Sequence, residues 1–197
     1  MTPRQYTLGR RAEAAEETRR RITQATLELH FERGIARTSM KDIAERADVG
    51  IGTVYHHFPT YNDAITACGQ LVFSLNPPPA PEVLDAHRGW DRVGAMVQAL
   101  MEFWVRWPML AEVRYEQAHY PALAAAMAGL EDWQTHFVRY ALEPLGVTPR
   151  DADVVRALSD YFVWNRLESA GFDTTAATAA VTDAVTAWLR STNRKAR

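Results

Sequence analysis

The sequence predicts an all-α protein, and three observations support this fold class. Apolar residues recur at the three- and four-residue spacing of amphipathic helices along most of the chain, and no segment alternates convincingly with the two-residue period of a strand. Of the 197 residues, 47% are hydrophobic and 23% are charged, which is enough for a packed core in one domain or two small ones. Glycines and prolines stand at the ends of the periodic stretches, where helices stop. We expect about nine helices.

Residues that typically begin or end helices predict the bounds of the first two helices. The first spans residues 12–33, whose apolar side chains keep to one face, and Gly34 ends it. Ser39, followed three residues later by Asp42, has the spacing of a capping box. The second helix therefore begins after Ser39.

A third and a fourth helix follow closely. A turn over residues 48–50 leads into the third helix, which ends at Phe58 because a proline comes next. Thr60 and Asp63 repeat the capping pattern, so the fourth helix covers residues 60–75.

A proline-rich stretch over residues 76–81 divides the chain. Proline fixes φ and lacks a backbone donor, so this stretch is expected to be a stiff extended connector. Beyond it, apolar stripes predict further helices, among them one from about residue 149 to 171 and a last one from residue 174. We divide the chain into a flexible basic arm over residues 1–12, a helical domain over 13–75 and a second helical domain over 76–197.

Charge is distributed unevenly along a chain whose net charge is −2. Residues 1–60 carry a net charge of +2, and residues 61–197 one of −4. An unstructured arginine arm can contact phosphates or enter a minor groove, although such arms are also often solvated tails. Six arginines precede the first long apolar pattern: Arg4, Arg10, Arg11, Arg19, Arg20 and Arg21.

Several classes of protein are disfavoured. Cys68 is the only cysteine, so an internal disulfide is excluded and a thiolate metal site would need more cysteines. The chain has no apolar run of about 18 residues and no apolar secretion signal at its start. Gly-rich phosphate loops and hydrolase motifs are also missing. We expect a cytoplasmic protein that is not an enzyme and has no membrane partner, cofactor or metal.

Residues 39–58 have the layout of a helix-turn-helix. A short capped helix, a tight turn containing glycine and a second short helix can pack their apolar sides together. One face of the second helix then stays free. A helix about 10–12 Å across fits a major groove about 12 Å wide, so this face can reach base edges.

The same region resembles the tetracycline-repressor (TetR) family. The resemblance lies in residues 20–34, 38–47 and 50–59, whose four elements follow in order at the family's separations. It covers roughly a third of the chain. It implies a homodimeric regulator of transcription, usually a repressor, whose C-terminal domain binds a small molecule and thereby moves two DNA-reading heads.

By the same resemblance, seven residues are expected to contact DNA. Lys41 would contact phosphate at the start of the second helix, and the others lie on the recognition helix. Hydroxyls can bond phosphate oxygens, and an isoleucine can contact a thymine methyl. The recognition-helix residues are Ile51, Gly52, Thr53, Tyr55, His56 and His57.

Three positions depart from the family pattern. Gly50 stands where a serine N-cap is common, and Tyr61 where a lysine is common. His30 takes the place of a core phenylalanine beside Phe31, and we expect the two to exchange roles, with His30 at the polar rim. Because the recognition helix carries no arginine or glutamine, much of the specificity is expected from DNA shape.

The second domain is rich in aromatic residues, most of them expected in ordinary core positions. A pocket lined by aromatic rings with a few polar groups suits a small hydrophobic or aromatic effector. Asn165 falls on an apolar stripe, so its amide must find a partner, either a ligand or a second subunit. The candidate pocket residues are Phe103, Trp104, Trp107, Tyr115, His119, Trp133, Phe137, Tyr161 and Asn165.

The last helix supplies the candidate dimer interface. By resemblance, the last two helices would form a four-helix interface with their symmetry mates. The candidates are Val181, Ala184, Val185 and Trp188. The alternative is that these positions pack inward within one chain.

The sequence thus predicts a repressor that binds a palindromic DNA operator as a dimer and is released by a small molecule. The alternative is a helical protein that binds small molecules and no longer binds DNA specifically. Loss of DNA binding in Tyr55→Ala combined with Lys41→Ala would separate the two.

Overall fold

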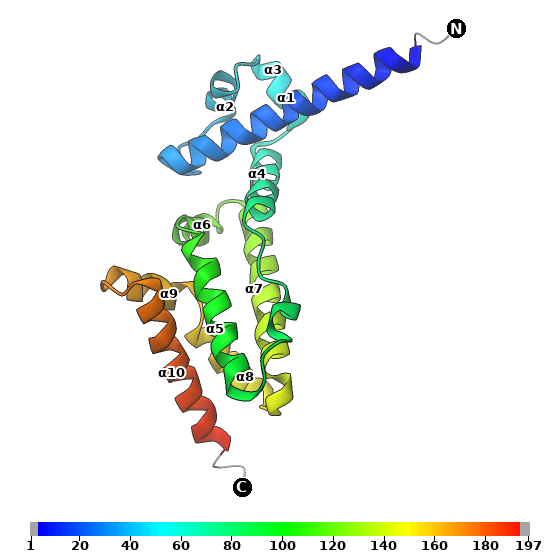
Figure 1. The fold of residues 1–197 in the computed structure, drawn as a ribbon. Coiled ribbons are helices and arrows are strands. Elements are labelled where there is room, and N and C mark those ends of the chain that lie inside the picture. Colours follow the sequence, from blue (N-terminus) through cyan, green and yellow to red (C-terminus); the bar gives the residue numbers. More distant parts are fainter. Residues whose placement is uncertain (1–3, 194–197) are drawn as a thin grey trace. The chain divides into compact units, whose positions relative to one another are not determined.

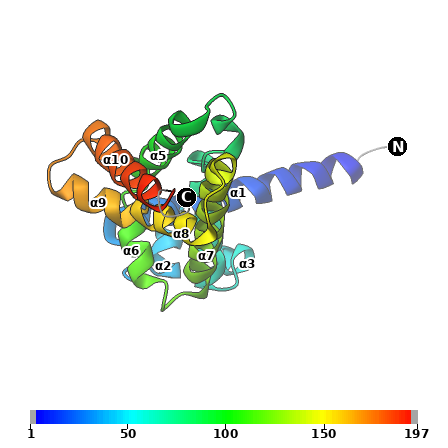
Figure 2. The same cartoon turned by 90° about the horizontal axis from the view of Figure 1, so that it is seen from below.

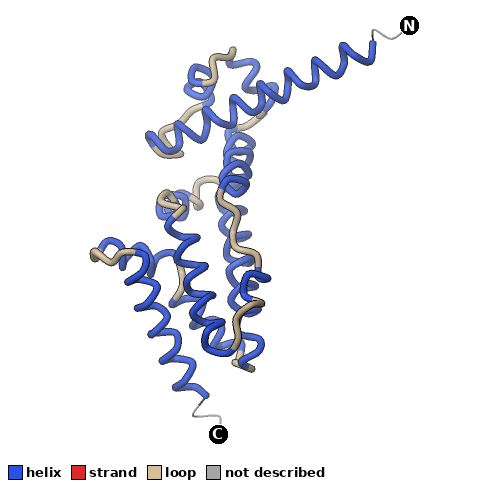
Figure 3. Tube along the Cα trace, viewed as in Figure 1, coloured by secondary structure: helices blue, strands red, loops and turns tan. Residues whose placement is uncertain are grey.

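The computed structural model describes residues 4–193 (Figure 1). These residues form ten α-helices and two 3₁₀ turns and contain no strand (Figure 3), so the all-α prediction is confirmed. The helices are α1 (Arg4–Arg33), α2 (Met40–Arg46), α3 (Ile51–His57), α4 (Tyr61–Leu75), α5 (Gly89–Val105), α6 (Leu110–Glu116), α7 (Pro121–Leu142), α8 (Pro149–Leu158), α9 (Tyr161–Ser169) and α10 (Thr174–Asn193), with 3₁₀ turns η1 (Pro81–Leu84) and η2 (Glu143–Leu145).

Two compact units make up the chain. The first comprises the residues up to Leu75 together with Glu112–Ala126, and the second comprises Asn76–Ala111 and the residues from Met127 onward. The sequence pattern predicts a single domain over residues 76–197. Glu112–Ala126 groups with the first unit because Leu123 packs with Ile35 and Ile65 in a small apolar cluster.

The first unit is organised around one face of α1. Ile22 of α1, Ile43 of α2 and Val54 of α3 have no exposed surface and share one apolar core with Phe58. Figure 1 shows α2 and α3 beside the C-terminal half of α1. These contacts set the helix-turn-helix against a rigid support.

Helix α1 begins at Arg4, so residues 4–12 are helical where the sequence predicted a flexible arm. Residues 9–17 are exposed on a stretch of α1 that extends beyond α2 and α3 (Figure 2). Charged pairs along the helix, such as Arg20 with Glu17 at 2.7 Å, support helical structure without tertiary contacts.

The second unit packs α5 against α10, and the two helices lie side by side in Figures 1 and 2. The single helix expected over residues 149–171 is interrupted between α8 and α9. The Asp160 carboxylate accepts a hydrogen bond from the Phe162 backbone N–H at 3.0 Å, which starts a new helix. The buried Ser159 carbonyl is free to accept the Trp104 indole N–H at 2.9 Å.

Among the helices of residues 4–193, none combines the length and the apolar character needed to cross a membrane.

Candidate nucleic-acid interface

Helix α2 starts at a complete capping box, as predicted. The Asp42 backbone N–H donates to Ser39 Oγ at 3.3 Å, and Asp42 Oδ2 accepts the Ser39 backbone N–H at 2.8 Å. Asp42 Oδ2 also accepts the Ser39 hydroxyl at 2.5 Å, and these bonds hold the pKa of Asp42 below its usual value. Two of the open donors at the helix start are thereby satisfied.

The turn between α2 and α3 is tight and contains a left-handed residue. Asp48 has φ of +51°, a conformation that aspartate tolerates better than most residues. Gly50 is the N-cap of α3 and makes no side-chain capping bond. Helix α3 therefore begins without the side-chain capping bond that α2 has.

One side of α3 is buried and the other faces outward. Val54 has no exposed surface, whereas Ile51 and Tyr55 are 43% and 51% exposed. Gly52 and His56 are exposed as well, and Thr53 and His57 are half-buried. The predicted contact residues of α3 thus gather on or beside its outward face.

Lys41 lies near this face at the start of α2. Its side chain is 81% exposed, and its Nζ lies 3.7 Å from Glu45 Oε1. A surface groove runs between α2 and α3 with Lys41 on its edge. The groove is lined by Ser39, Met40, Lys41, Ala44, Glu45, Val49, Ile51 and Tyr55.

The two histidines at the end of α3 lie ring to ring. Their centroids are 5.3 Å apart in an edge-on arrangement. Partial burial lowers the pKa of His57, and the adjacent His56 and Arg19 lower it further. The lowered pKa favours the neutral form of His57 at neutral pH.

The arginines of α1 behave differently from the predicted phosphate-binding arm. Arg19 Nη1 donates to the His57 carbonyl at 3.1 Å, and Arg21 Nη2 donates to the carbonyls of Ala47 and Asp48. Arg20 pairs with Glu17 along the surface of α1. Arg19 and Arg21 are thus engaged with the helix-turn-helix itself.

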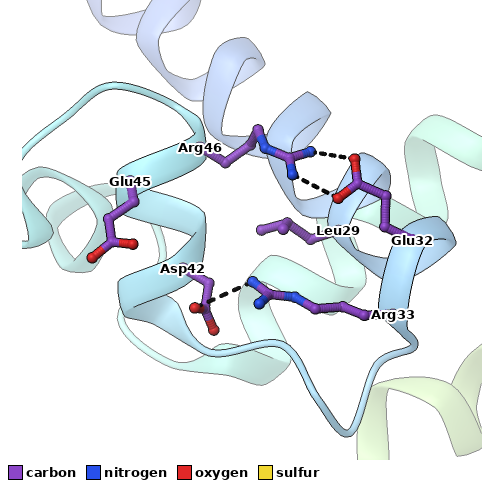
Figure 4. A pocket seen from close by; sticks show the side chains of 6 residues that line it. All are labelled: Leu29, Glu32, Arg33, Asp42, Glu45 and Arg46. Atoms are coloured by element: carbon purple, nitrogen blue, oxygen red, sulfur yellow. Dashed lines mark hydrogen bonds and ion pairs between the residues drawn. The ribbon is translucent and has the colours of Figure 1, made fainter.

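Ion pairs hold α2 to the end of α1 (Figure 4). Arg46 donates to both carboxylate oxygens of Glu32, at 2.7 and 2.6 Å, and Arg33 lies 3.2 Å from Asp42. The hydrogen bond from Arg46 lowers the pKa of Glu32 and raises that of Arg46. The dashed lines in Figure 4 cross a surface pocket with Leu29 between the two pairs, so α2 is held on both sides of an apolar contact.

The predicted exchange between His30 and Phe31 is wrong. His30 is 3% exposed and Phe31 is 56% exposed. The Tyr61 hydroxyl donates to the Ile35 carbonyl at 2.7 Å and lies 2.9 Å from His30 Nε2, while His30 Nδ1 lies 3.5 Å from Cys68 Sγ. Both ring nitrogens of the buried histidine therefore have partners.

This network also determines the charge state of His30. Because Tyr61 donates its proton to Ile35, its oxygen accepts from His30, which places the histidine proton on Nε2. Burial lowers the pKa of His30 to about 4 and raises that of the Cys68 thiol to about 12. His30 is a neutral core residue, and Tyr61 points inward instead of contacting phosphate.

Sequence reasoning missed one basic residue beside the interface. Arg37 is exposed in the loop between α1 and α2, two residues before the cap Ser39. A basic residue directly before a capping box at the start of a helix-turn-helix is a signal that could have identified it.

The structure brings together six of the nine candidate pocket residues, all in the second unit. Ring centroids of Phe103 lie 4.9 Å from those of Trp104 and Trp133, and Trp133 stacks on Phe137 at 5.5 Å. Trp107 and Tyr161 continue this cluster. Asn165 is half-buried on α9.

The other two candidates lie in the first unit. Tyr115 is 85% exposed and His119 is also exposed. Tyr115 lies on α6, and His119 lies in the loop between α6 and α7.

The candidate dimer residues divide into two groups. Val181 and Val185 are 3% and 0% exposed inside the second unit, so the inward-packing alternative holds for both. Helix α10 packs against α5, α8 and α9 of the same unit. Ala184 is exposed and Trp188 is half-buried.

A capped short helix, a tight turn and a second short helix with a bare outer face define the helix-turn-helix class of DNA-binding proteins. Residues 22–62 match the family model described as "Bacterial regulatory proteins, tetR family". Over these residues the chain is similar to the TetR family, and the curated relatives described next are named as regulators of transcription.

Two curated relatives illustrate the similarity. The HTH-type transcriptional repressor KstR of Mycolicibacterium smegmatis is 32% identical over 102 residues, which are 51% of this chain and 50% of KstR. The HTH-type transcriptional regulator TtgR of Pseudomonas putida is 41% identical over 58 residues, 29% of this chain and 28% of TtgR. The matched regions span half or less of these relatives.

Solved structures match over most of the chain. The multidrug binding protein EbrR, complexed with imidazole, has a TM-score of 0.65 at 19% identity and covers 86% of this chain and 93% of its own. NalD, the secondary repressor of the MexAB-OprM efflux pump in Pseudomonas aeruginosa, has a TM-score of 0.60 at 22% identity, covering 89% and 97%. At these identities the likeness shows a shared fold.

Proposed function

We propose that this protein is a DNA-binding repressor of transcription. The outward face of α3 carries the proposal, because Ile51, Tyr55 and His56 are exposed there while Val54 anchors the opposite side. A major groove about 12 Å wide admits such a helix. We infer that the protein represses transcription because KstR and NalD are both named repressors.

The contacts follow from the side chains at this face. Lys41 and the Tyr55 hydroxyl bind phosphate oxygens, and Ile51 packs on a thymine methyl. Gly52 lets the backbone approach the duplex, and Thr53 adds a hydroxyl beside it. His56 and His57 contact the backbone or base edges further along α3. Because α3 has neither arginine nor glutamine, DNA shape contributes much of the specificity.

The repressor acts as a homodimer on a palindromic operator. Two recognition helices then lie about 34–36 Å apart, one helical turn of DNA. The outward side of α10 presents small side chains that let a helix of a second copy approach closely. Its exposed alanines are Ala176, Ala179, Ala184 and Ala187.

A small hydrophobic or aromatic molecule releases the repressor from DNA. The rings of the aromatic cluster are buried in this structure, and such a ligand would contact them where a cavity opens between the helices of the second unit. The solved EbrR structures include complexes with proflavin and malachite green, which both contain aromatic rings. A ligand that prefers one of two arrangements of the dimer shifts the population by its differential affinity, and about 1–3 kcal/mol changes operator affinity about 5- to 150-fold.

Retention on DNA tests the proposal. Fragments upstream of the protein's own gene are titrated with the full chain at several salt concentrations. Wild type is expected to bind with strong salt dependence, and the variant combining Tyr55→Ala with Lys41→Ala to lose specific binding. Phe31→Ala is the matched control, because Phe31 is an exposed aromatic residue of the same unit on α1.

Two outcomes would contradict the proposal. Equal retention of wild type and the double variant would show that α3 does not read DNA. Absence of any DNA binding, with ligand binding intact, would identify the alternative, a helical protein that binds small molecules only.

The release step is tested separately with biphenyl as an uncharged aromatic probe. Binding to the native state is expected to raise the Tm of the second unit and to lower retention on the operator fragment. A raised Tm with unchanged DNA retention would contradict release by a ligand, while the proposed repressor function would stand.

A further inference from the structure

Helix α3 has few anchors of its own. It is seven residues long, has Val54 as its buried residue, and begins at Gly50 without a side-chain cap. A helix this short is not stable in isolation. Its direction relative to α1 therefore depends on the core contacts of Val54 and Phe58 together with hydrogen bonds from neighbouring side chains.

Arg19 holds the C-terminal end of α3. Its Nη1 donates to the carbonyl of His57, the last residue of the helix, at 3.1 Å. Its guanidinium carbon also lies 4.4 Å from the ring centroid of Phe58, which is 1% exposed. A cation at this end of a helix is favoured by the helix dipole, and the stacking limits how far the guanidinium can move.

Arg21 holds the turn that leads into α3. Its Nη2 donates to the carbonyl of Ala47, the C-cap of α2, and to that of Asp48 at 3.0 Å. Asp48 is the left-handed residue of the turn. One planar guanidinium bonded to two successive carbonyls fixes the direction in which the chain leaves α2.

We infer that Arg19 and Arg21 are positioning residues for DNA recognition, which hold α3 by the turn before it and by the carbonyl at its end. The inference rests on the proposed DNA-binding function. Both guanidinium groups bond protein carbonyls, so their contribution to affinity comes through the orientation of α3. If a variant leaves α3 correctly oriented in about a tenth of the molecules, the apparent Kd rises about tenfold.

Salt dependence of DNA binding separates positioning from phosphate contact. Arg19→Gln and Arg21→Gln are each expected to weaken operator binding about tenfold while the slope of log K against log salt stays at its wild-type value. Lys41→Gln, which removes a proposed phosphate contact, is expected to reduce that slope by about one. Arg20→Gln is the matched control, because Arg20 lies between the two on α1 and pairs with Glu17 on the surface.

Two results would overturn the inference. A slope reduced by about one in Arg19→Gln or Arg21→Gln would make that arginine a phosphate ligand. Affinities equal to that of Arg20→Gln would show that α3 needs neither arginine. Arg19→Lys is expected to regain part of the affinity, since a lysine can still donate to the His57 carbonyl; no regain would contradict the role of this bond.

Amide hydrogen exchange without DNA provides the second measurement. Faster exchange is expected over residues 51–58 in Arg19→Gln and over residues 48–54 in Arg21→Gln, with the second unit unchanged. Unchanged exchange in both segments would reject the positioning role of the two arginines and leave the proposed DNA-binding function intact. Faster exchange in a protein whose wild type binds no DNA rejects the proposed function and restricts the arginines to anchoring α3.

Discussion

The two units of the chain are stabilised by different kinds of contact. The first has a core of mostly small aliphatic side chains, and arginines bonded to carboxylates and carbonyls join its helices. The second is built on aromatic rings such as those of Phe103, Trp104 and Tyr161, all without exposed surface. Arg92, which is deeply buried in the second unit, donates to the carbonyls of Leu84, Ala141 and Tyr140.

This difference follows from what each unit presents to its surroundings. In the proposed function α3 reads DNA and must leave one face exposed, so it contributes little buried area and is held in part by directional polar bonds. The second unit buries large rings and gains most from apolar area, at about 25 cal/mol per Å². Substitutions in the aromatic core should therefore lower the free energy of unfolding most. Substitutions around α3 should instead change the orientation of that helix.

The largest effect is expected for Trp104→Ala. The change removes a fully buried indole and leaves the Ser159 carbonyl without its 2.9 Å indole donor. The free energy of unfolding of the second unit should fall by about 3–5 kcal/mol, measured by urea denaturation followed by circular dichroism. The control is Trp90→Ala on the same helix, because Trp90 is 38% exposed. Similar losses in the two variants would show that the aromatic cluster is not the main source of stability.

An intermediate effect is expected from acid in the first unit. The folded pKa of His30 is about 4, below the usual 6.5, so between these values the unfolded chain binds more protons. The stability contributed by neutral His30 is complete above about pH 6.5 and is lost as pH falls toward 4, a change of about 3 kcal/mol.

Urea unfolding at pH 7, 6 and 5 measures this dependence. His30→Phe, which cannot titrate, should flatten the part of the pH profile that His30 causes, although His57, whose pKa is also lowered, keeps a smaller slope. Identical profiles for His30→Phe and wild type would mean that His30 is not buried in its neutral form.

The smallest effect is expected for Gly50→Ser, and it is stabilising. A Cβ at Gly50 would meet Thr53 Oγ1 at 3.9 Å, an ordinary contact, so the serine fits and can cap α3 as Ser39 caps α2. The gain should be a few tenths of a kcal/mol and should slow amide exchange at the start of α3. Gly50→Ala, which adds the Cβ without the hydroxyl, is the control. Equal stability of the two variants would show that the missing cap does not limit α3.

Local patterns predicted much of the fold. The capping boxes at Ser39 and Thr60 lie where their spacing placed them, and Val54 and Phe58 are inside, which leaves the predicted face of α3 outside. Each of these features depends on residues within four positions of one another. The candidate DNA-contact residues could therefore be placed, although their contacts with DNA stay predictions.

Partners that are distant in sequence decided the rest. His30 can be buried because Tyr61, 31 residues away, forms a hydrogen bond with its ring. No local sequence pattern predicts this partner. Val181 and Val185 are buried in a unit where α10 packs against α5, α8 and α9, and Arg19 and Arg21 meet carbonyls that only the folded turn brings to α1. The amino-acid order determined which residues share a helix face. Tertiary packing decided which neighbouring helix covers that face and which carbonyl bonds to a given guanidinium. The reason is that buried polar groups need hydrogen-bond partners and apolar groups need apolar neighbours, and both can lie far away in the sequence.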